Sequence, residues 1–349
     1  MQNLKYSLSF LLGLLIISSC NVDDGGVNGN WIIPENEVLN GGPGKDGIPA
    51  IGNPELINAS DATYLENSEL IMGWVENGEA RAYPHEILDW HEIINDKVGN
   101  HAFAITYCPL TGTGIGWEAA IDGVNTTFGV SGLLYNSNLI PYDRKTDSNW
   151  SQLGLDCVEG ELAGRQIETF NTVETTWKTW ETMYPNTKVV SRNTGYNRDY
   201  DRYPYNNYRT DEALLFPVNN SDARIHQKER VHGILINNKA KAYQFTPFQN
   251  GVTAIQDVFE GSDIVIVGSE PQNFIVSFYR QLEDGTTLDF TAIDNDSATI
   301  LQDNEGNEWD IFGNAVSGTR VGQKLIPTTS FIGYWFSFPA FYGDVEVYE

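Results

Sequence analysis

The chain has few basic residues, cysteines and histidines, and each shortage limits the partners or the catalytic and metal-binding motifs that the sequence can contain. Its 349 residues include 21 Lys and Arg against 47 Asp and Glu, which gives a formal net charge of -26 at pH 7. Such a charge repels phosphate groups, so the composition argues against nucleic acid and anionic surfaces as partners. We expect no nucleic-acid partner, whereas neutral and cationic ligands remain compatible with the charge.

Cysteine and histidine form none of the common catalytic or metal-binding motifs. The 3 cysteines contain no Cys-x-x-Cys pair, and His91-Glu92 is not followed by the second histidine of a His-Glu-x-x-His motif. Apart from Cys20, the thiols are Cys108 and Cys157. In an oxidising compartment two thiols can form a disulfide, but the sequence does not place their Cα atoms within bridging distance, so the pairing stays open.

The apolar run near the N-terminus, residues 8–17, is too short to span a membrane and suits the hydrophobic region of a signal peptide. Ser18, Ser19 and Cys20 follow it, in a pattern that resembles the bacterial lipoprotein box. We therefore predict a lipoprotein signal peptide over residues 1–20, with Cys20 as the lipidation site. The membrane, reached through this lipid, is an expected partner. The expected location is the outer membrane or the cell surface.

Much of the remaining chain is repeated. Residues 73–83 read GWVENGEARAY, and residues 233–243 read GILINNKAKAY, 160 positions later. The repeat continues in tryptophans and glycines at nearly constant spacing. The matching pairs are Trp150 and Trp309, Gly154 and Gly313, Gly160 and Gly318, Gly164 and Gly322, and Trp177 and Trp335. From this repeat we predict the following divisions: a flexible Gly/Asn/Asp-rich tether over 21–46, a first half over 47–190, an irregular Tyr/Arg/Asn-rich connection over 191–232, and a second half over 233–349.

Turn signals and periodicity predict an α+β fold of two pseudo-repeated halves, dominated by antiparallel sheet with short helices. Asn77-Gly78 and Asn237-Asn238 each separate two runs typical of strands, as in β-hairpins. A helix is expected over residues 85–95, with His91 on its apolar face, and a buried strand over 102–107. The second half is expected to repeat this order, with a short helix over 253–259.

Cys108 and His91 are the candidate catalytic residues. Cys108 ends the strand over 102–107, whereas the second half has Gly268-Ser269 at the equivalent place. With His91 as base, Cys108 is a candidate nucleophile. Alternatively, the two residues are candidate ligands for copper or zinc, together with His85, His101 or Glu92. In the competing interpretation both are ordinary core residues.

A second polar cluster follows, and it predicts a site for a sugar or another small polar ligand. Amides, an Asp-Arg pair and aromatic rings supply hydrogen bonds and a stacking face, as such sites require. The candidate ligand-binding residues are Asn136, Asn138, Tyr142, Asp143, Arg144, Trp150 and Gln152. The same residues are also compatible with a turn network that satisfies its own hydrogen bonds.

Several runs resemble the bacterial domain-of-unknown-function family 3179. They are residues 80–84 (ARAYP), 90–96 (WHEIIND), 107–113 (YCPLTGT) and 128–138 (FGVSGLLYNSN). The resemblance covers roughly residues 47–343 and implies no particular reaction. Three functions are therefore carried forward. The first is a cell-envelope lipoprotein with a Cys/His centre for thiol catalysis or metal binding, the second is a non-catalytic module that binds a sugar or small polar ligand, and the third is a purely structural role in an envelope complex.

Overall fold

The structure, a computed structural model, describes residues 30–349. These residues form 28 strands and three short α-helices, which confirms the predicted dominance of antiparallel sheet with short helices. The helices are α1 (His85–His91), α2 (Trp177–Met183) and α3 (Ser337–Tyr342), and the 3₁₀ turns are η1 (Glu35–Glu37), η2 (Ala59–Asp61) and η3 (Thr246–Phe248). Over this described part of the chain, no helix is long and apolar enough to cross a membrane. The predicted signal peptide, Cys20 and the start of the tether lie outside the described residues.

Three five-stranded sheets and a small hairpin occupy the described chain up to Val190. The first sheet has the order β16 (Val173–Thr176), β4 (Leu70–Glu76), β5 (Glu79–Pro84), β17 (Lys188–Val190) and β3 (Leu56–Asn58). The second has the order β15 (Thr169–Phe170), β8 (Thr113–Glu118), β7 (His101–Cys108), β6 (Ile93–Val98) and β2 (Ile51–Gly52). The third has the order β1 (Leu39–Asn40), β11 (Phe128–Tyr135), β12 (Asn138–Asp143), β13 (Asn149–Ser151) and β14 (Asp156–Glu159), and the hairpin pairs β9 (Ala120–Ile121) with β10 (Val124–Asn125).

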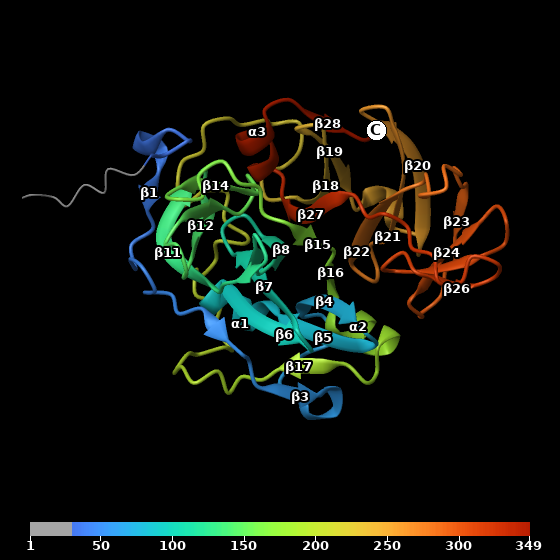
Figure 1. Cartoon of the computed structure of the whole chain (residues 1–349), viewed down its shortest axis with the longest axis horizontal. Coiled ribbons are helices and arrows are strands. Elements are labelled where there is room, and N and C mark those ends of the chain that lie inside the picture. The colour runs from blue at the N-terminus through green and yellow to red at the C-terminus, as the bar shows by residue number, and fades with distance from the viewer. Residues whose placement is uncertain (1–29) are drawn as a thin grey trace, which may run out of the picture.

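Three further sheets lie after Arg230 (Figure 1). One has the order β27 (Thr329–Tyr334), β18 (Arg230–Ile236), β19 (Lys239–Gln244) and β28 (Val345–Val347). The others are β20 (Thr253–Phe259), β21 (Ser262–Ser269) and β22 (Phe274–Tyr279), and then β23 (Phe290–Ala292), β24 (Thr299–Asp303), β25 (Glu308–Asp310) and β26 (Ala315–Ser317). The orders β27-β18-β19-β28 and β16-β4-β5-β17 have the same pairing: antiparallel, antiparallel, parallel.

Both predicted hairpins are confirmed. Asn77 and Gly78 have φ of 49° and 78°, and Asn237 and Asn238 have φ of 51° and 59°. Two successive residues of positive φ form the turn whose twist matches that of a two-residue hairpin, and Asn and Gly tolerate this backbone best. The pairs Glu76–Glu79 and Ile236–Lys239 close the two loops.

Two predicted helices were wrong in extent or kind. The helix expected over residues 85–95 ends at His91, because Glu92 takes a left-handed φ of 57° and the chain then enters β6. Residues 253–259, expected as a helix, form β20 instead and pair along their whole length with β21. A short 3₁₀ turn, η3, precedes β20 where α1 precedes β6.

The two predicted halves share their cores. One hydrophobic cluster joins β4, β5 and α2 to the second half. In this cluster the Trp180 ring of α2 lies 6.2 Å from the Phe312 ring of the second half. Another joins the sheet of β11, β12 and β13 to β18, β19 and α3, with Trp150 and Trp335 fully buried. Between Val190 and Arg230 the described chain contains turns and bends only, and this connection packs near α1 and the end of β7.

Candidate functional site

Cys108 lies at the end of β7 and is only 1% exposed. Its thiol donates a weak hydrogen bond to the Ser137 carbonyl oxygen, 3.7 Å away. Burial and, secondarily, the nearby Glu92 carboxylate raise the pKa of Cys108 to about 11. The group is therefore a thiol at neutral pH, whereas a cysteine nucleophile needs the thiolate.

His91 is fully buried, but its hydrogen-bond partners do not include Cys108. Its Nδ1 lies 2.7 Å from the Pro49 carbonyl oxygen, and its Nε2 lies 2.7 Å from the Tyr200 hydroxyl. A carbonyl oxygen only accepts, so Nδ1 carries the proton and Nε2 accepts from Tyr200. Neither ring nitrogen is left for Cys108, and the geometry does not form the expected Cys108–His91 dyad, because α1 directs His91 toward the Pro49 segment and the connection.

The structure does not group the residues expected to bind copper or zinc. Within residues 30–349, no three or more His, Cys, Asp or Glu side chains are grouped to hold a metal ion. His101 instead bridges two carboxylates, with its ring nitrogens 2.6 Å from Glu76 and 2.6 Å from Glu118. Cys108 and Cys157 are both buried and free, so no disulfide joins them.

The predicted ligand-binding residues divide among separate networks instead of lining one site. Asn138 and Gln152 belong to a buried network with three threonines. Asp143 and Trp150 belong to a turn, where the Trp150 indole donates to Asp143 at 3.2 Å. Asn136 links distant chain segments through the Ala340 carbonyl and the Asn219 backbone N–H.

The buried network around Gln152 satisfies its own hydrogen bonds. Gln152 Oε1 accepts from Asn138 at 2.7 Å and from Thr113 at 2.9 Å. Its Nε2 donates to the Thr106 hydroxyl at 3.1 Å and to the Thr113 carbonyl at 3.1 Å. Asn138 also donates to Thr111 at 2.9 Å. These contacts support the interpretation in which the amides hold the loop together.

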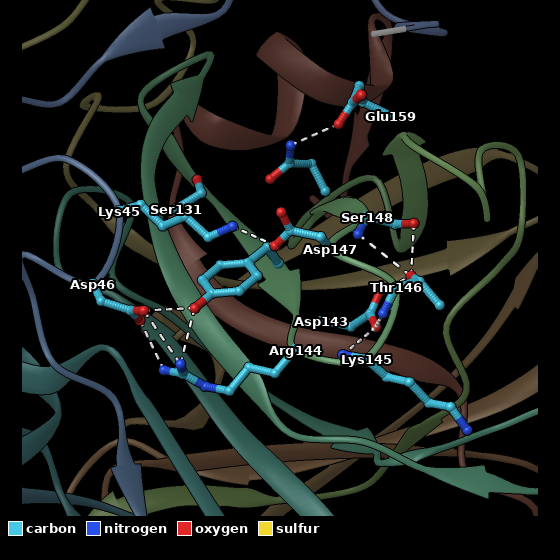
Figure 2. A network of polar contacts seen from close by, with 12 residues as sticks. Lys45, Asp46, Ser131, Asp143, Arg144, Lys145, Thr146, Asp147, Ser148 and Glu159 are labelled. Atoms are coloured by element: carbon cyan, nitrogen blue, oxygen red, sulfur yellow. Dashed lines mark hydrogen bonds and ion pairs between the residues drawn. The ribbon is translucent and has the colours of Figure 1, made fainter. Parts of the chain in front are cut away.

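The buried Tyr142 and the more exposed Arg144 both contact the Asp46 carboxylate. The Tyr142 hydroxyl donates to Asp46 at 2.6 Å, and the Arg144 guanidinium donates to the same carboxylate at 2.7 Å and 3.2 Å. Figure 2 shows Arg144 directed at Asp46 and Lys45 directed at Asp147, with which it forms an ion pair. Both basic groups are therefore paired within the protein.

A cluster that the sequence interpretation missed lies on α1. His85 and Asp89 are four residues apart, so their side chains share one face of the helix, and both are buried. Asp89 accepts two hydrogen bonds from Arg209 Nη2, at 2.6 Å and 2.9 Å. The Arg209 guanidinium lies 4.0 Å from the centre of the Tyr203 ring. Burial raises the pKa of Asp89 to about 7, although Arg209 acts to lower it.

His85 connects this cluster to the second half. Its Nε2 lies 3.5 Å from the Glu174 carboxylate of β16, which accepts a hydrogen bond from Arg230 of β18. Burial, followed by the positive charges of Arg209 and Arg230, lowers the pKa of His85 well below its ordinary value. The imidazole is therefore neutral at neutral pH.

These side chains border a cavity of about 420 Å³ between α1 and the connection. Its walls are Ser68, Glu69, Leu70, His85, Glu86, Asp89, Tyr200, Asp201, Arg202, Tyr203 and Arg209. A larger groove of about 600 Å³ lies near the start of α2, but its ionisable residues Lys178, Asp294 and Asp296 are all exposed. Unlike this groove, the cavity beside α1 is bordered by buried ionisable groups, His85 and Asp89.

The second half has no equivalent of this cluster. At the spacing of the repeat, His85 and Asp89 correspond to Phe245 and Gln249. A different polar triad occurs in both halves: Tyr83 and Arg81 hydrogen bond to Asp96, and Tyr243 and Lys241 contact Asp257 in the same way. Contacts present in both halves suit a role in stability, whereas His85 and Asp89 are specific to the first half.

A family model described as protein of unknown function (DUF3179) matches residues 45–345. The chain belongs to this family. Neither the curated proteins nor the solved structures searched give a match. All the residues that line the cavity lie inside the region matched by DUF3179.

Proposed function

We propose that the chain is a cell-envelope lipoprotein that binds a small neutral polar ligand, such as a sugar, in the cavity beside α1. One observation carries the proposal: a cavity of about 420 Å³ is bordered by two buried ionisable side chains, His85 and Asp89, that the second half lacks. This volume is in the range of small-molecule sites. The Cys108 thiol has no role in this proposal.

The charges around the cavity favour a hydroxyl-rich ligand over an anion. The acidic residues Glu69, Glu86, Asp89 and Asp201 outnumber the basic residues Arg202 and Arg209. Carboxylates accept hydrogen bonds from the hydroxyl groups of a ligand, and guanidinium groups donate hydrogen bonds to those hydroxyl groups. The Tyr203 ring is an aromatic surface on which a sugar ring can stack. The net charge of -26 also disfavours an anionic ligand.

We also propose that the two halves arose by duplication and that the second half is a scaffold without the ligand site. The shared pairing pattern of β16-β4-β5-β17 and β27-β18-β19-β28 supports this proposal. So do the matching indole hydrogen bonds, from Trp150 to Asp143 and from Trp309 to Asp303. Superposition of residues 73–185 on 233–343 in an experimental structure tests the duplication, and a different strand order there would contradict it.

Anchoring through Cys20 remains part of the proposal and rests on the sequence alone. Cys20→Ser should move the protein from the membrane fraction to the soluble fraction. Retention of this variant in the membrane fraction would remove the lipid anchor from the account.

Ligand binding is tested by saturation-transfer NMR with glucose, galactose, mannose and N-acetylglucosamine as probes. We expect at least one sugar to receive saturation from the wild-type protein and to lose it in Asp89→Asn and Tyr203→Ala. Arg144→Ala, in the separate network around Asp46, is the matched control and should leave the signal unchanged. No transfer to any of the four sugars, or loss of transfer only in Arg144→Ala, would overturn the proposed site.

A further inference from the structure

Buried polar atoms without a hydrogen-bond partner gather at one place in the described chain. Residues 30–349 contain six such side-chain atoms, and three of them are His85 Nε2, Glu174 Oε2 and His232 Nδ1. His85 Nε2 and Glu174 Oε2 lie 3.5 Å apart. Glu174 and His232 border the same small cavity. Because unpaired buried polar atoms are costly, a cluster of three indicates a missing bonding partner.

The small cavity has the size of a single water molecule. Its volume is about 20 Å³, and a site needs roughly 10–15 Å³ of this kind of volume to hold one water. It lies between the two halves, with Met72 and Glu174 on one side and His232, Ile275 and Ser330 on the other. β16 and β22, which flank it, lie side by side in Figure 1.

We propose that Glu174 and His232 hold one buried water across the boundary between the halves, and that Glu174 also fixes His85 as the neutral tautomer protonated at Nε2. His85, which borders the ligand cavity, then has Nδ1 as its hydrogen-bond acceptor. The water and the tautomer follow from the contacts of Glu174. The ligand half of the inference rests on the proposed function.

The surrounding contacts set which atoms donate. Arg230 donates to one Glu174 oxygen, which favours the ionised carboxylate against the burial that raises its pKa. An ionised carboxylate only accepts, so in the proposed arrangement His85 Nε2, 3.5 Å from Oε2, is the donor of that pair, and the water also donates to Oε2. His232 Nε2 lies 2.8 Å from the Ser277 hydroxyl, and burial lowers the pKa of His232 to about 3. This neutral imidazole leaves Nδ1 free to bond the water.

The tautomer restricts the ligand class. An acceptor at His85 Nδ1 requires a ligand group that donates a hydrogen bond. Hydroxyl and amino groups meet this requirement, whereas carboxylate, phosphate and ether oxygens do not. Within the proposed sugar site, His85 is therefore a residue that determines specificity and contacts a free hydroxyl group.

The test uses the full chain labelled with ¹⁵N in its histidine rings, together with a high-resolution crystal structure. Long-range ¹H–¹⁵N spectra should show His85 protonated at Nε2 and unprotonated at Nδ1 near neutral pH. Glu174→Gln should lose this preference, while the control Glu118→Gln should alter His101 only. The crystal structure should show one water bonded to Glu174 Oε2 and His232 Nδ1.

Four results would overturn the inference: a cationic His85, a His85 protonated at Nδ1 alone, a refined cation beside Glu174 and His232, or no density there. If Glu174→Gln fails to fold, the wild-type spectra and the density still decide. These readouts need no sugar. Failure of sugar binding alone would therefore remove the proposed function while leaving the water and the tautomer in place.

Discussion

At the scale of single residues, burial decides the charge of the groups around α1. Glu92, at the end of this helix, is 6% exposed, and its side chain accepts one hydrogen bond, from the Tyr205 hydroxyl at 3.2 Å. Burial raises the pKa of Glu92 to about 7, despite the opposing effect of this hydrogen bond. A raised folded-state pKa means that the folded protein holds a proton that the unfolded chain has already released between about pH 4.5 and 7.

This shift predicts how Glu92→Gln changes stability with pH. Glu92 contributes to the free energy of unfolding, and linkage sets how this contribution changes with pH. The contribution is full below about pH 4.5 and is lost as pH rises through about 7. Relative to the wild type, Glu92→Gln should gain free energy of unfolding between pH 5 and pH 8, with an upper bound of about 3 kcal/mol. Urea unfolding at both pH values measures it, with the exposed Glu283→Gln as control. An equal effect of Glu92→Gln at both pH values would contradict the buried, proton-binding carboxyl.

The two described thiols give a second prediction. Burial raises the pKa of Cys108 to about 11 and that of Cys157 to about 12, so both should resist iodoacetamide at pH 7.5 in the folded protein. Peptide mapping should find both labelled only after denaturation. Rapid labelling of Cys108 that slows in His91→Ala would instead restore the thiolate interpretation.

At the scale of elements, the connection between the halves depends on one lysine. Lys228 is 7% exposed, and its Nζ donates to the carbonyl oxygens of Tyr208, Asp211 and Ala213 at 2.5, 2.6 and 2.9 Å. It also lies 3.6 Å from the centre of the Tyr208 ring. These bonds hold the segment that contributes Tyr203 and Arg209 to the cavity.

Lys228→Met should therefore destabilise the protein by roughly 2–4 kcal/mol, because it leaves one buried and two part-buried carbonyl oxygens without this donor. Cleavage within residues 200–215 by a broad-specificity protease should become faster. The control Lys239→Met changes an exposed lysine on β19 and should have little effect. Unchanged urea unfolding and proteolysis in Lys228→Met would show that other contacts hold the connection.

Two glycines give a paired prediction about helix packing. A Cβ at Gly73 would lie 2.4 Å from the Trp180 ring of α2, and a Cβ at Gly233 would lie 1.9 Å from the Phe338 ring of α3. Each glycine allows a helix to pack directly on the first strand of its hairpin. Gly73→Ala and Gly233→Ala should each cost roughly 1–3 kcal/mol by urea unfolding, through overpacking. A large cost for one and none for the other would weaken the proposed equivalence of the halves.

At the scale of the whole molecule, the parts that the sequence predicts are those set by local chemistry. Asn77-Gly78 and Asn237-Asn238 form hairpins because their backbones tolerate positive φ, and residues 102–107 form a strand because the run is apolar and β-branched or aromatic in part. The prediction of a helix over residues 253–259 is wrong, because these residues form a strand by pairing with β21, and the local sequence does not show this pairing.

The candidate site was harder to predict, because its contacts join distant segments. His91 meets Tyr200, 109 residues away, and Asp89 meets Arg209, 120 residues away. Helical spacing placed His91 on a buried face but did not identify what covers that face. The one available signal for Arg209 and Tyr203 was the length of the irregular connection, since long loops in compact proteins are often functional.

The central claim is that a duplicated molecule has one ligand site, in its first half beside α1. Isothermal titration calorimetry with the sugar that gives the strongest saturation-transfer signal tests it directly. The account predicts one sugar per chain in the wild type and in Arg144→Ala, and no measurable binding in Asp89→Asn. Two sugars per chain, or full binding in Asp89→Asn, would contradict it.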